Sequence, residues 1–380
     1  MRTSLVEEGL GVQAVPCSGS FQAAYACAGL EKPGHDCLCR AGMMEHPAGC
    51  RQRILPITRA AWPAGILDPG QARNVLDATP NAQGENQDML STHQGPDAGR
   101  ASFRSIVVAT DLSDGSDEVV RAAGEVAARS AASLHVVHAI DVPAGGGNEP
   151  HEEQVREAER LLDALIGRDV PAEVAAEHHV GGFPPERAIM EWADRAGAGL
   201  IVLGPHVRRA GPARLLGSTA ERVLGGAGVP CLVVRAPLAV PSSHVVVAVD
   251  PAHDLEPVLD AAIHWALLFA GAEGAGGAPK LSVLHVTNDP RSGSPPVLDE
   301  ALRGALSRGD EEGRLTASLA LRGTDVVQSI LLFAEVEATD LLVLSTRNRG
   351  LVGRALLGSV SAEVTRRAPC NVLLVPPRPK

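Results

Sequence analysis

The chain carries one pattern of residues twice, and this internal duplication constrains its fold more than any other feature. The stretch GPHVRRAGPARLLGST, residues 204–219, has a counterpart in STRNRGLVGRALLGSV, residues 345–360. In each copy an aliphatic run precedes a loop that contains arginines, and Leu-Leu-Gly-Ser follows at the same distance. This order predicts a buried strand, a loop able to hold an anion, and the start of a helix.

The duplication extends well beyond these two loops. SIVVATDLSD, residues 105–114, matches HVVVAVDPAHD, residues 244–254, and both end an aliphatic run on an acidic residue. LHVVHAID similarly matches LSVLHVTND, and VPCLVVR matches APCNVLLVP. A repeat of this length indicates two copies of one structural unit. We therefore predict two domains of about 135 residues each, at 103–236 and 244–377, which is a typical domain size.

The composition favours the α/β class for both domains. Hydrophobic residues make up 45% of the chain but aromatic residues only 2%, so the cores must be built from aliphatic side chains. Short aliphatic runs that alternate with helical stretches are typical of buried parallel strands. We expect two tandem open parallel sheets with helices on both faces. Ligands of such sheets bind outside the carboxyl ends of the strands, where the strand order reverses.

Charge and hydropathy exclude some kinds of partner. The formal net charge is −11, which argues against nucleic acid, because binding to phosphate backbones needs a basic face. No run of about 18 apolar residues is present, so no membrane partner is expected. The N-terminus also lacks the pattern of a signal peptide, and a cytoplasmic location is the default expectation.

Residues 1–100 lack the alternating aliphatic and helical patterns of the rest of the chain, which predicts a disordered or low-structure N-terminal extension. They show no sustained periodicity, and residues 81–101 read as a polar linker. An alternative interpretation is a zinc site built from Cys37, Cys39, Cys50, His35 and His46. Because one residue separates Cys37 from Cys39, the spacing fits no common zinc finger, and we predict no metal site.

Several segments in the same order resemble the universal stress protein family. They are ATDLSD, LHVVHAID, GLIVLG and LLGSTAERVL in the first half, and GSVSAEVTRRAPCNVLLVP in the second. The resemblance covers about residues 103–236 and 244–377. It implies two Rossmann-like domains of the adenine nucleotide alpha hydrolase type in a tandem member of the family. It also implies pairing of the two domains through their last strands, and a homodimer is compatible with it.

The nucleotide-binding branch of this family carries a Gly-x2-Gly-x9-Gly-(Ser/Thr) motif around the phosphates of ATP. In the first repeat the motif falls on Gly204, Val207, Gly217 and Ser218; in the second it falls on Ser345, Asn348, Gly358 and Ser359. Val207 departs from the motif, because a β-branched residue is unfavourable where the backbone needs a positive φ or lies close to a phosphate. The second repeat keeps only the final pair.

The resemblance also places nucleoside contacts. The acid that ends the first strand corresponds to Asp111 and Asp250, with Thr110 nearby. Helix capping is an equally good interpretation of both aspartates, since Asp is a favoured N-cap residue. The adenine contact points to Leu134 or Leu281, although leucines inside strands are more often core residues.

Other polar residues in the strands favour structural roles. His138 and His285 lie within aliphatic runs and are expected to be hydrogen-bonded packing residues. Cys231 and Cys370 each follow a proline in apolar surroundings, where an inert core cysteine is expected rather than a redox centre.

Two functions remain open at this point. The first is a regulatory module that binds ATP or another adenine nucleotide, with or without Mg²⁺, and hydrolyses it at most slowly and incidentally. No catalytic motif such as a P-loop, a nucleophile elbow or a zinc-protease helix is present. The second is a scaffold of the same fold that binds no nucleotide and serves dimerisation or partner docking.

Overall fold

The structure is a computed structural model that describes most of the two repeats. The described residues are 73–74, 103–113, 115–140, 151–182, 184–204, 216–271, 278–287, 294–310, 313–322, 325–346 and 358–378. All of them belong to one compact unit, residues 59–380. Apart from Arg73 and Asn74, the predicted N-terminal extension lies outside the described residues, as do its cysteines and the zinc alternative.

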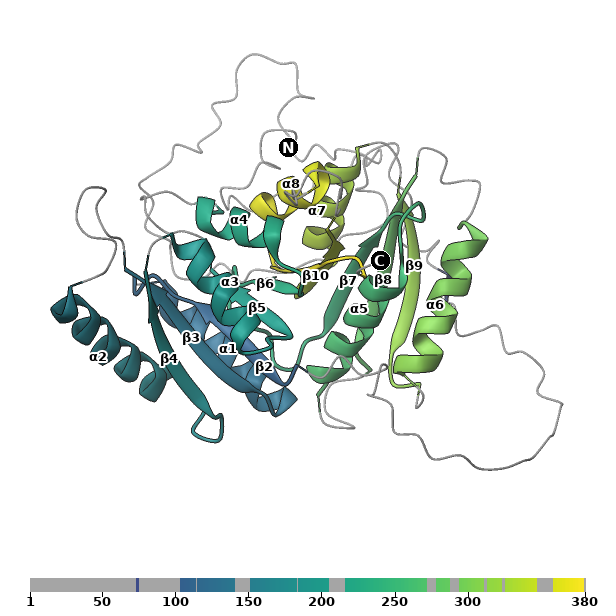
Figure 1. The fold of residues 1–380 in the computed structure, drawn as a ribbon. Coiled ribbons are helices and arrows are strands. Elements are labelled where there is room, and N and C mark those ends of the chain that lie inside the picture. The colour runs from purple at the N-terminus through teal and green to yellow at the C-terminus, as the bar shows by residue number, and fades with distance from the viewer. Residues whose placement is uncertain are drawn as a thin grey trace, which may run out of the picture. The chain divides into compact units, whose positions relative to one another are not determined.

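Each repeat forms five parallel strands of a doubly wound sheet (Figure 1). The strands of the first repeat are β2 (Ser105–Ala109), β3 (Ser133–Ala139), β4 (Ala176–Gly181), β5 (Leu200–Leu203) and β6 (Cys231–Val233). Those of the second are β7 (His244–Val249), β8 (Lys280–Val286), β9 (Thr316–Arg322), β10 (Leu341–Ser345) and β11 (Asn371–Val375). The order is β6-β5-β2-β3-β4 in one repeat and β11-β10-β7-β8-β9 in the other.

Helices cover both faces of the sheet, as the sequence predicts. They are α1 (Ser116–Ser130), α2 (Glu152–Asp169), α3 (Pro185–Arg195), α4 (Ser218–Gly226), α5 (Glu256–Leu268), α6 (Pro296–Gly309), α7 (Val326–Val336) and α8 (Ser359–Arg367). Buried residues of α1, α2, α5 and α6 form one core, whereas those of α3, α4, α7 and α8 form the other. Each strand therefore divides its side chains between the two cores, and Ile106 and Val107 on β2 are both fully buried.

The two sheets are continuous rather than separate. Strand β11 pairs antiparallel with β6, with Leu373 opposite Leu232, so that all eleven described strands belong to one sheet. The two-residue strand β1 (Arg73–Asn74) pairs antiparallel with β9 at the far edge. All other pairings are parallel. The α/β class, the parallel strands and the two repeats are thus confirmed.

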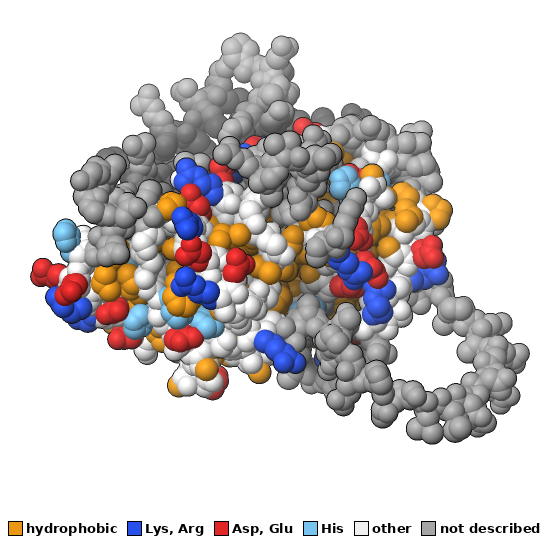
Figure 2. Space-filling model, viewed as in Figure 1, with side chains coloured by type: hydrophobic (Ala, Val, Ile, Leu, Met, Phe, Trp, Pro, Cys, Tyr) orange, Lys and Arg blue, Asp and Glu red, His pale blue; other side chains and the backbone are white. Residues whose placement is uncertain are grey.

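No helix within the described ranges combines the length and apolar character that crossing a lipid bilayer requires. On the face shown in Figure 2, acidic and basic side chains are interspersed among one another. This agrees with ion pairs such as Arg187 with Glu191 and Arg222 with Glu186.

Candidate functional site

The strand order reverses between β2 and β5, and most of the predicted site residues meet at this point. Val108 of β2 lies opposite Val202 of β5, so Thr110 and Gly204 each stand two residues beyond one register pair. Helix α4 then begins at Ser218 on the face of α3, whereas α1 follows β2 on the opposite face. Helices thus leave the sheet on different sides of this switch point, which is the expected position of a ligand-binding crevice.

Asp111 organises the turn that follows β2. Its Oδ1 accepts hydrogen bonds from the Ser113 amide at 3.0 Å, the Ser113 hydroxyl at 2.6 Å and the Ser116 hydroxyl at 2.7 Å. The bond to an amide two residues on is an Asx turn, a local structure that aspartate favours. The N-cap of α1 is Gly115, so the helix-cap interpretation of Asp111 is wrong.

Thr110 joins this turn to the neighbouring strand. The Thr110 amide donates to the carbonyl O of Val137 at 3.0 Å, and its buried hydroxyl accepts from the Leu112 amide at 3.1 Å. Leu112 has a φ of 57°, a left-handed conformation that is uncommon for a leucine. His138 Nδ1 donates to the carbonyl O of Thr110 at 3.0 Å, which confirms the structural role predicted for this histidine.

The second repeat builds the same turn with different partners. Asp250 Oδ1 accepts from the Ala252 amide at 3.1 Å, again two residues on, and its Oδ2 lies 3.4 Å from His253 Nδ1. The N-cap of α5 is Leu255, so Asp250 does not cap that helix either. His285 Nδ1 donates to the carbonyl O of Val249 at 3.3 Å, as His138 does in the first repeat.

Gly204 and the start of α4 form the other side of the crevice in the first repeat. A Cβ on Gly204 would lie 2.7 Å from Cγ2 of Val119 in α1, so glycine is needed for this close approach. Gly217 is the N-cap of α4 and supplies no side-chain hydrogen bond to the first turn. Ser218 is exposed, and the amide groups of this first turn are available to an anion.

In the second repeat, the residues at the corresponding position form hydrogen bonds within the protein. Ser345 takes the place of Gly204, and its carbonyl O accepts a hydrogen bond from Ser361 Oγ at 2.8 Å. The next residue, Thr346, donates its amide to the carbonyl O of Val375 at 2.9 Å. Gly358 is the N-cap of α8, and Ser359 begins that helix, as Gly217 and Ser218 do for α4.

Leu134 does not belong to this crevice. It lies opposite Ile106, near the amino ends of β2 and β3, whereas Thr110 and Gly204 follow the carboxyl ends of their strands. Its side chain is fully buried among apolar residues of the α1 and α2 face. The same holds for Leu281, so the structure supports the core interpretation of both leucines instead of the adenine contact.

Val207 and Asn348 lie outside the described residues, together with the arginines of both loops. Among the described site residues, Thr110 and Gly204 follow the two strands that flank the switch point, Asp111 comes next after Thr110, and Gly217 and Ser218 begin the helix that follows β5. Asp250, Gly358 and Ser359 occupy the equivalent places of the second repeat.

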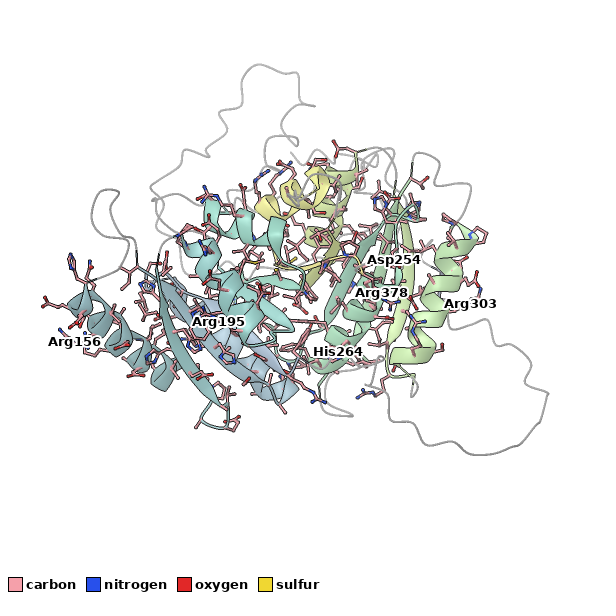
Figure 3. All side chains as sticks on the ribbon, in the orientation of Figure 1. Arg156, Arg195, Asp254, His264, Arg303 and Arg378 are labelled. Carbon is pink, nitrogen blue, oxygen red and sulfur yellow. The ribbon has the colours of Figure 1, made fainter. Side chains whose placement is uncertain are left out.

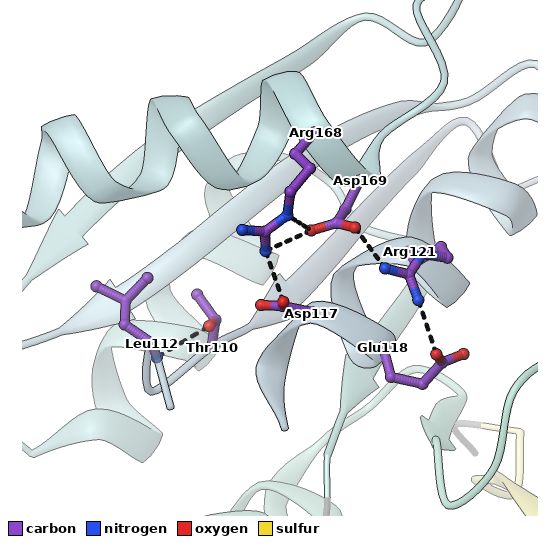
Figure 4. A network of polar contacts seen from close by, with 7 residues as sticks. All are labelled: Thr110, Leu112, Asp117, Glu118, Arg121, Arg168 and Asp169. Carbon is purple, nitrogen blue, oxygen red and sulfur yellow. Dashed lines mark hydrogen bonds and ion pairs between the residues drawn. The ribbon is translucent and has the colours of Figure 1, made fainter. Parts of the chain in front are cut away.

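An ion-pair network holds the helix that follows the Asp111 turn (Figure 4). Asp169, at the end of α2, has a side chain that is only 2% exposed and accepts from Arg121 Nη2 at 2.6 Å and Arg168 Nε at 2.9 Å. Arg168 also reaches Asp117 at 2.6 Å, and Arg121 reaches Glu118 at 2.9 Å. These ion pairs join the end of α2 to the first turns of α1, the helix that follows the Asp111 turn.

Cys231 and Cys370 are buried core residues, as predicted. Burial raises the pKa of each thiol to about 12, so neither forms a reactive thiolate near neutral pH. A different cluster, of His135, Glu177 and His179, was missed by the sequence analysis. The only sequence signal for it is the Glu-His-His run in β4, which does not reveal the third residue on β3.

Comparison with known proteins agrees with this arrangement. The family model described as Universal stress protein family matches residues 102–235 and 242–376. A curated universal stress protein of Thermus aquaticus is 37% identical over 116 residues, 28% of this chain and 84% of that protein. The universal stress protein MJ0531 of Methanocaldococcus jannaschii is 31% identical over 147 residues, 37% of this chain and 86% of that protein.

A solved structure shares the fold over both repeats. The crystal structure of a universal stress protein from Archaeoglobus fulgidus superimposes with a TM-score of 0.51 and 22% identity. The match covers 73% of this chain and 97% of the solved one.

Proposed function

The chain belongs to the universal stress protein family, and on that premise we propose that it is a regulatory module that binds one adenine nucleotide, ATP, in the crevice of its first repeat. The proposal rests on the two kinds of group that follow the strands on either side of the switch point. An acidic side chain, Asp111, lies on the β2 side, and the start of α4, without a side-chain cap, lies on the β5 side.

These groups suit the two ends of a nucleotide. The carboxylate of Asp111 can accept hydrogen bonds from ribose hydroxyls, while the first-turn amides of α4 and the Ser218 hydroxyl can donate to phosphate oxygens. Gly204 lets the β5 turn pass close to α1 without a Cβ in the way. The described groups supply binding contacts and no assembled nucleophile with a general base, so the proposed role is binding rather than rapid hydrolysis.

The second repeat is the weaker candidate within the same proposal. Ser345 replaces the glycine, and Ser361 already bonds to the Ser345 carbonyl at 2.8 Å. Asp250 has His253 beside it at 3.4 Å, which Asp111 does not have in the corresponding place. We therefore expect one nucleotide per chain.

Calorimetric titration of ATP into nucleotide-stripped protein tests the proposal. We expect one site per chain, with ATP also found in denaturing extracts of the purified protein. Asp111→Ala should abolish the binding heat, and Asp250→Ala is the matched control that should leave it unchanged. Absence of heat at millimolar ATP, with no nucleotide in the extract, would contradict the proposal and leave the nucleotide-free scaffold as the function.

Val207→Gly is a second test, aimed at the one departure from the glycine motif in the first repeat. Removing the β-branched side chain should raise the ATP affinity, because a glycine there allows close approach of the backbone to a phosphate. An affinity equal to that of the wild type would mean that Val207 does not limit binding. Asn348→Gly in the second repeat is the control and should not change the stoichiometry.

A further inference from the structure

A cluster of two histidines and one glutamate lies on the α3 face of the sheet, apart from the crevice. His135 of β3 lies directly opposite Glu177 of β4, and His179 follows Glu177 by two residues on the same strand. Alternation along a strand puts all three side chains on one face, which is the face covered by α3. The cluster thus joins two neighbouring strands of the sheet.

The three side chains bring one ligand atom each to a common point. His135 Nδ1 lies 3.1 Å from His179 Nε2 and 3.0 Å from Glu177 Oε1, and the last two atoms are 4.0 Å apart. A tetrahedral zinc ion with ligands at about 2.0–2.2 Å holds its ligand atoms about 3.3–3.6 Å apart. The three separations lie on both sides of this range, so small side-chain adjustments would bring the three atoms to the spacing of metal ligands.

The surroundings hold the histidines in place. The ring of His179 stacks on Trp192 of α3, with centroids 3.6 Å apart and planes inclined by 14°. The guanidinium carbon of Arg195, a residue labelled in Figure 3, lies over the Trp192 ring at 5.1 Å from the ring centre. The side chains of His135 and His179 are only 12% and 11% exposed, whereas Glu177 is 63% exposed. Two ligands are thus fixed by packing, and the third faces solvent.

We propose that His135, Glu177 and His179 form a binding site for a divalent transition metal ion, with zinc as the best fit. Two imidazoles and one carboxylate suit zinc and its neighbours in the first transition row, and they do not suit Mg²⁺ or Ca²⁺, which prefer oxygen ligands. Three protein ligands leave a fourth position for water or a small ligand. The ion would also tie β4, the last strand of the described sheet, to β3.

A cavity of about 360 Å³ lies beside the site on the same face. It is lined by Gly182, Pro184, Arg187 and Arg195, and it shares Trp192 with the cluster. This cavity gives solvent a route to the α3 face next to the proposed ion.

Titration of Co²⁺ and Zn²⁺ into the full chain, after treatment with a chelator, tests the proposal. Co²⁺ bound by nitrogen and oxygen ligands gives visible absorption without the near-ultraviolet sulfur-to-metal band, which separates this site from the N-terminal cysteines. We expect one such ion per chain, displaced by Zn²⁺. Glu177→Gln and His179→Gln should each weaken Zn²⁺ binding at least tenfold, because loss of even a supporting group typically costs about tenfold or more.

His178→Asn is the matched control. His178 lies between the two β4 ligands but faces the other side, 3.0 Å from Asp163 of α2, so its replacement should leave the affinity unchanged. Circular dichroism serves to check that each variant folds, and Glu177→Gln is expected to fold because that side chain is largely exposed. Absence of a cobalt spectrum of this type, or equal affinities in wild type and Glu177→Gln, would overturn the proposal.

Discussion

Gly204 is the residue on which the geometry of the crevice depends most directly. It directly follows β5, and any side chain there would meet Val119, a buried residue of α1. This close contact lets the end of β5 lie against α1, the helix that follows the Asp111 turn. The second repeat, with Ser345 at this position, does not impose the same requirement.

Gly204→Ala should therefore destabilise the protein. The new Cβ would lie 2.7 Å from Val119 Cγ2, and overpacking of this kind lowers the free energy of unfolding by about 1–3 kcal/mol. Urea unfolding followed by circular dichroism measures the change. Gly167→Ala is the control, because nothing lies within 4 Å of its added Cβ in α2, and it should stabilise the protein by about 0.5–1 kcal/mol. Equal midpoints for Gly204→Ala and wild type would contradict this account.

Single residues also mark the limits of prediction from sequence. The strand-terminal positions of Asp111 and Asp250 followed from the pattern, but their Asx turns did not, because capping and turn formation use the same residue type. For Leu134 the sequence leaves a core role and an adenine contact open, and its full burial near the amino end of β3 favours the core role. The His135 cluster depends on the register between two strands, and no local pattern encodes that register.

At the scale of elements, the fastening of α2 to α1 supports the crevice from behind. The carboxylate of Asp169 lies between two arginines, one from each helix, and is almost fully buried. The alternation of aliphatic runs with helical stretches predicts helices in this repeat. It does not predict this contact, because charged side chains on amphipathic helices are usually solvated.

Asp169→Asn should loosen the contact between α2 and α1. The amide keeps the shape of the carboxylate but loses its charge, and hydrogen bonds to charged groups contribute about 2 kcal/mol to the free energy of unfolding. Urea unfolding should show this loss, and amide hydrogen exchange should show faster opening of α2. Glu157→Gln is the control, since its ion pair with Arg160 lies on the exposed surface of the same helix. Protection of α2 that equals the wild type in Asp169→Asn would argue against a fastening role.

At the scale of the whole molecule, the antiparallel pair β6–β11 makes one sheet from two repeats. Duplication and alternation of strands and helices determine the topology of each repeat, which is why the fold was predictable. The contact between the two repeats depends on particular side chains. Asn371 Oδ1 accepts from the amides of Arg235 and Ala236 at 2.7 and 3.0 Å, across the boundary between the repeats.

Arg235 extends this join to the end of a helix. Its Nε donates to the carbonyl O of Ala368 at 2.8 Å, and its Nη1 donates to that of Thr365 at 3.1 Å. These carbonyls belong to the last turn and the C-cap of α8, where helices leave acceptors unsatisfied and favour a positive charge. A side chain of the first repeat therefore completes a helix of the second.

Arg235→Met should weaken the coupling between the repeats. The apolar stem is retained, but two partly buried carbonyls lose a charged donor, which should lower the free energy of unfolding by about 2 kcal/mol. Because Trp192 lies in the first repeat and Trp265 in the second, tryptophan fluorescence and circular dichroism together report on both. We expect a lower urea midpoint and a shallower transition as the repeats begin to unfold separately. Arg366→Met is the matched control, since Arg366 also bridges the repeats, to Glu221 at 2.9 Å, but does so through an exposed ion pair that contributes little. If both variants unfold in the same way as the wild type, the helix-end contacts of Arg235 do not couple the repeats, and the pairing of β6 with β11 must do so alone.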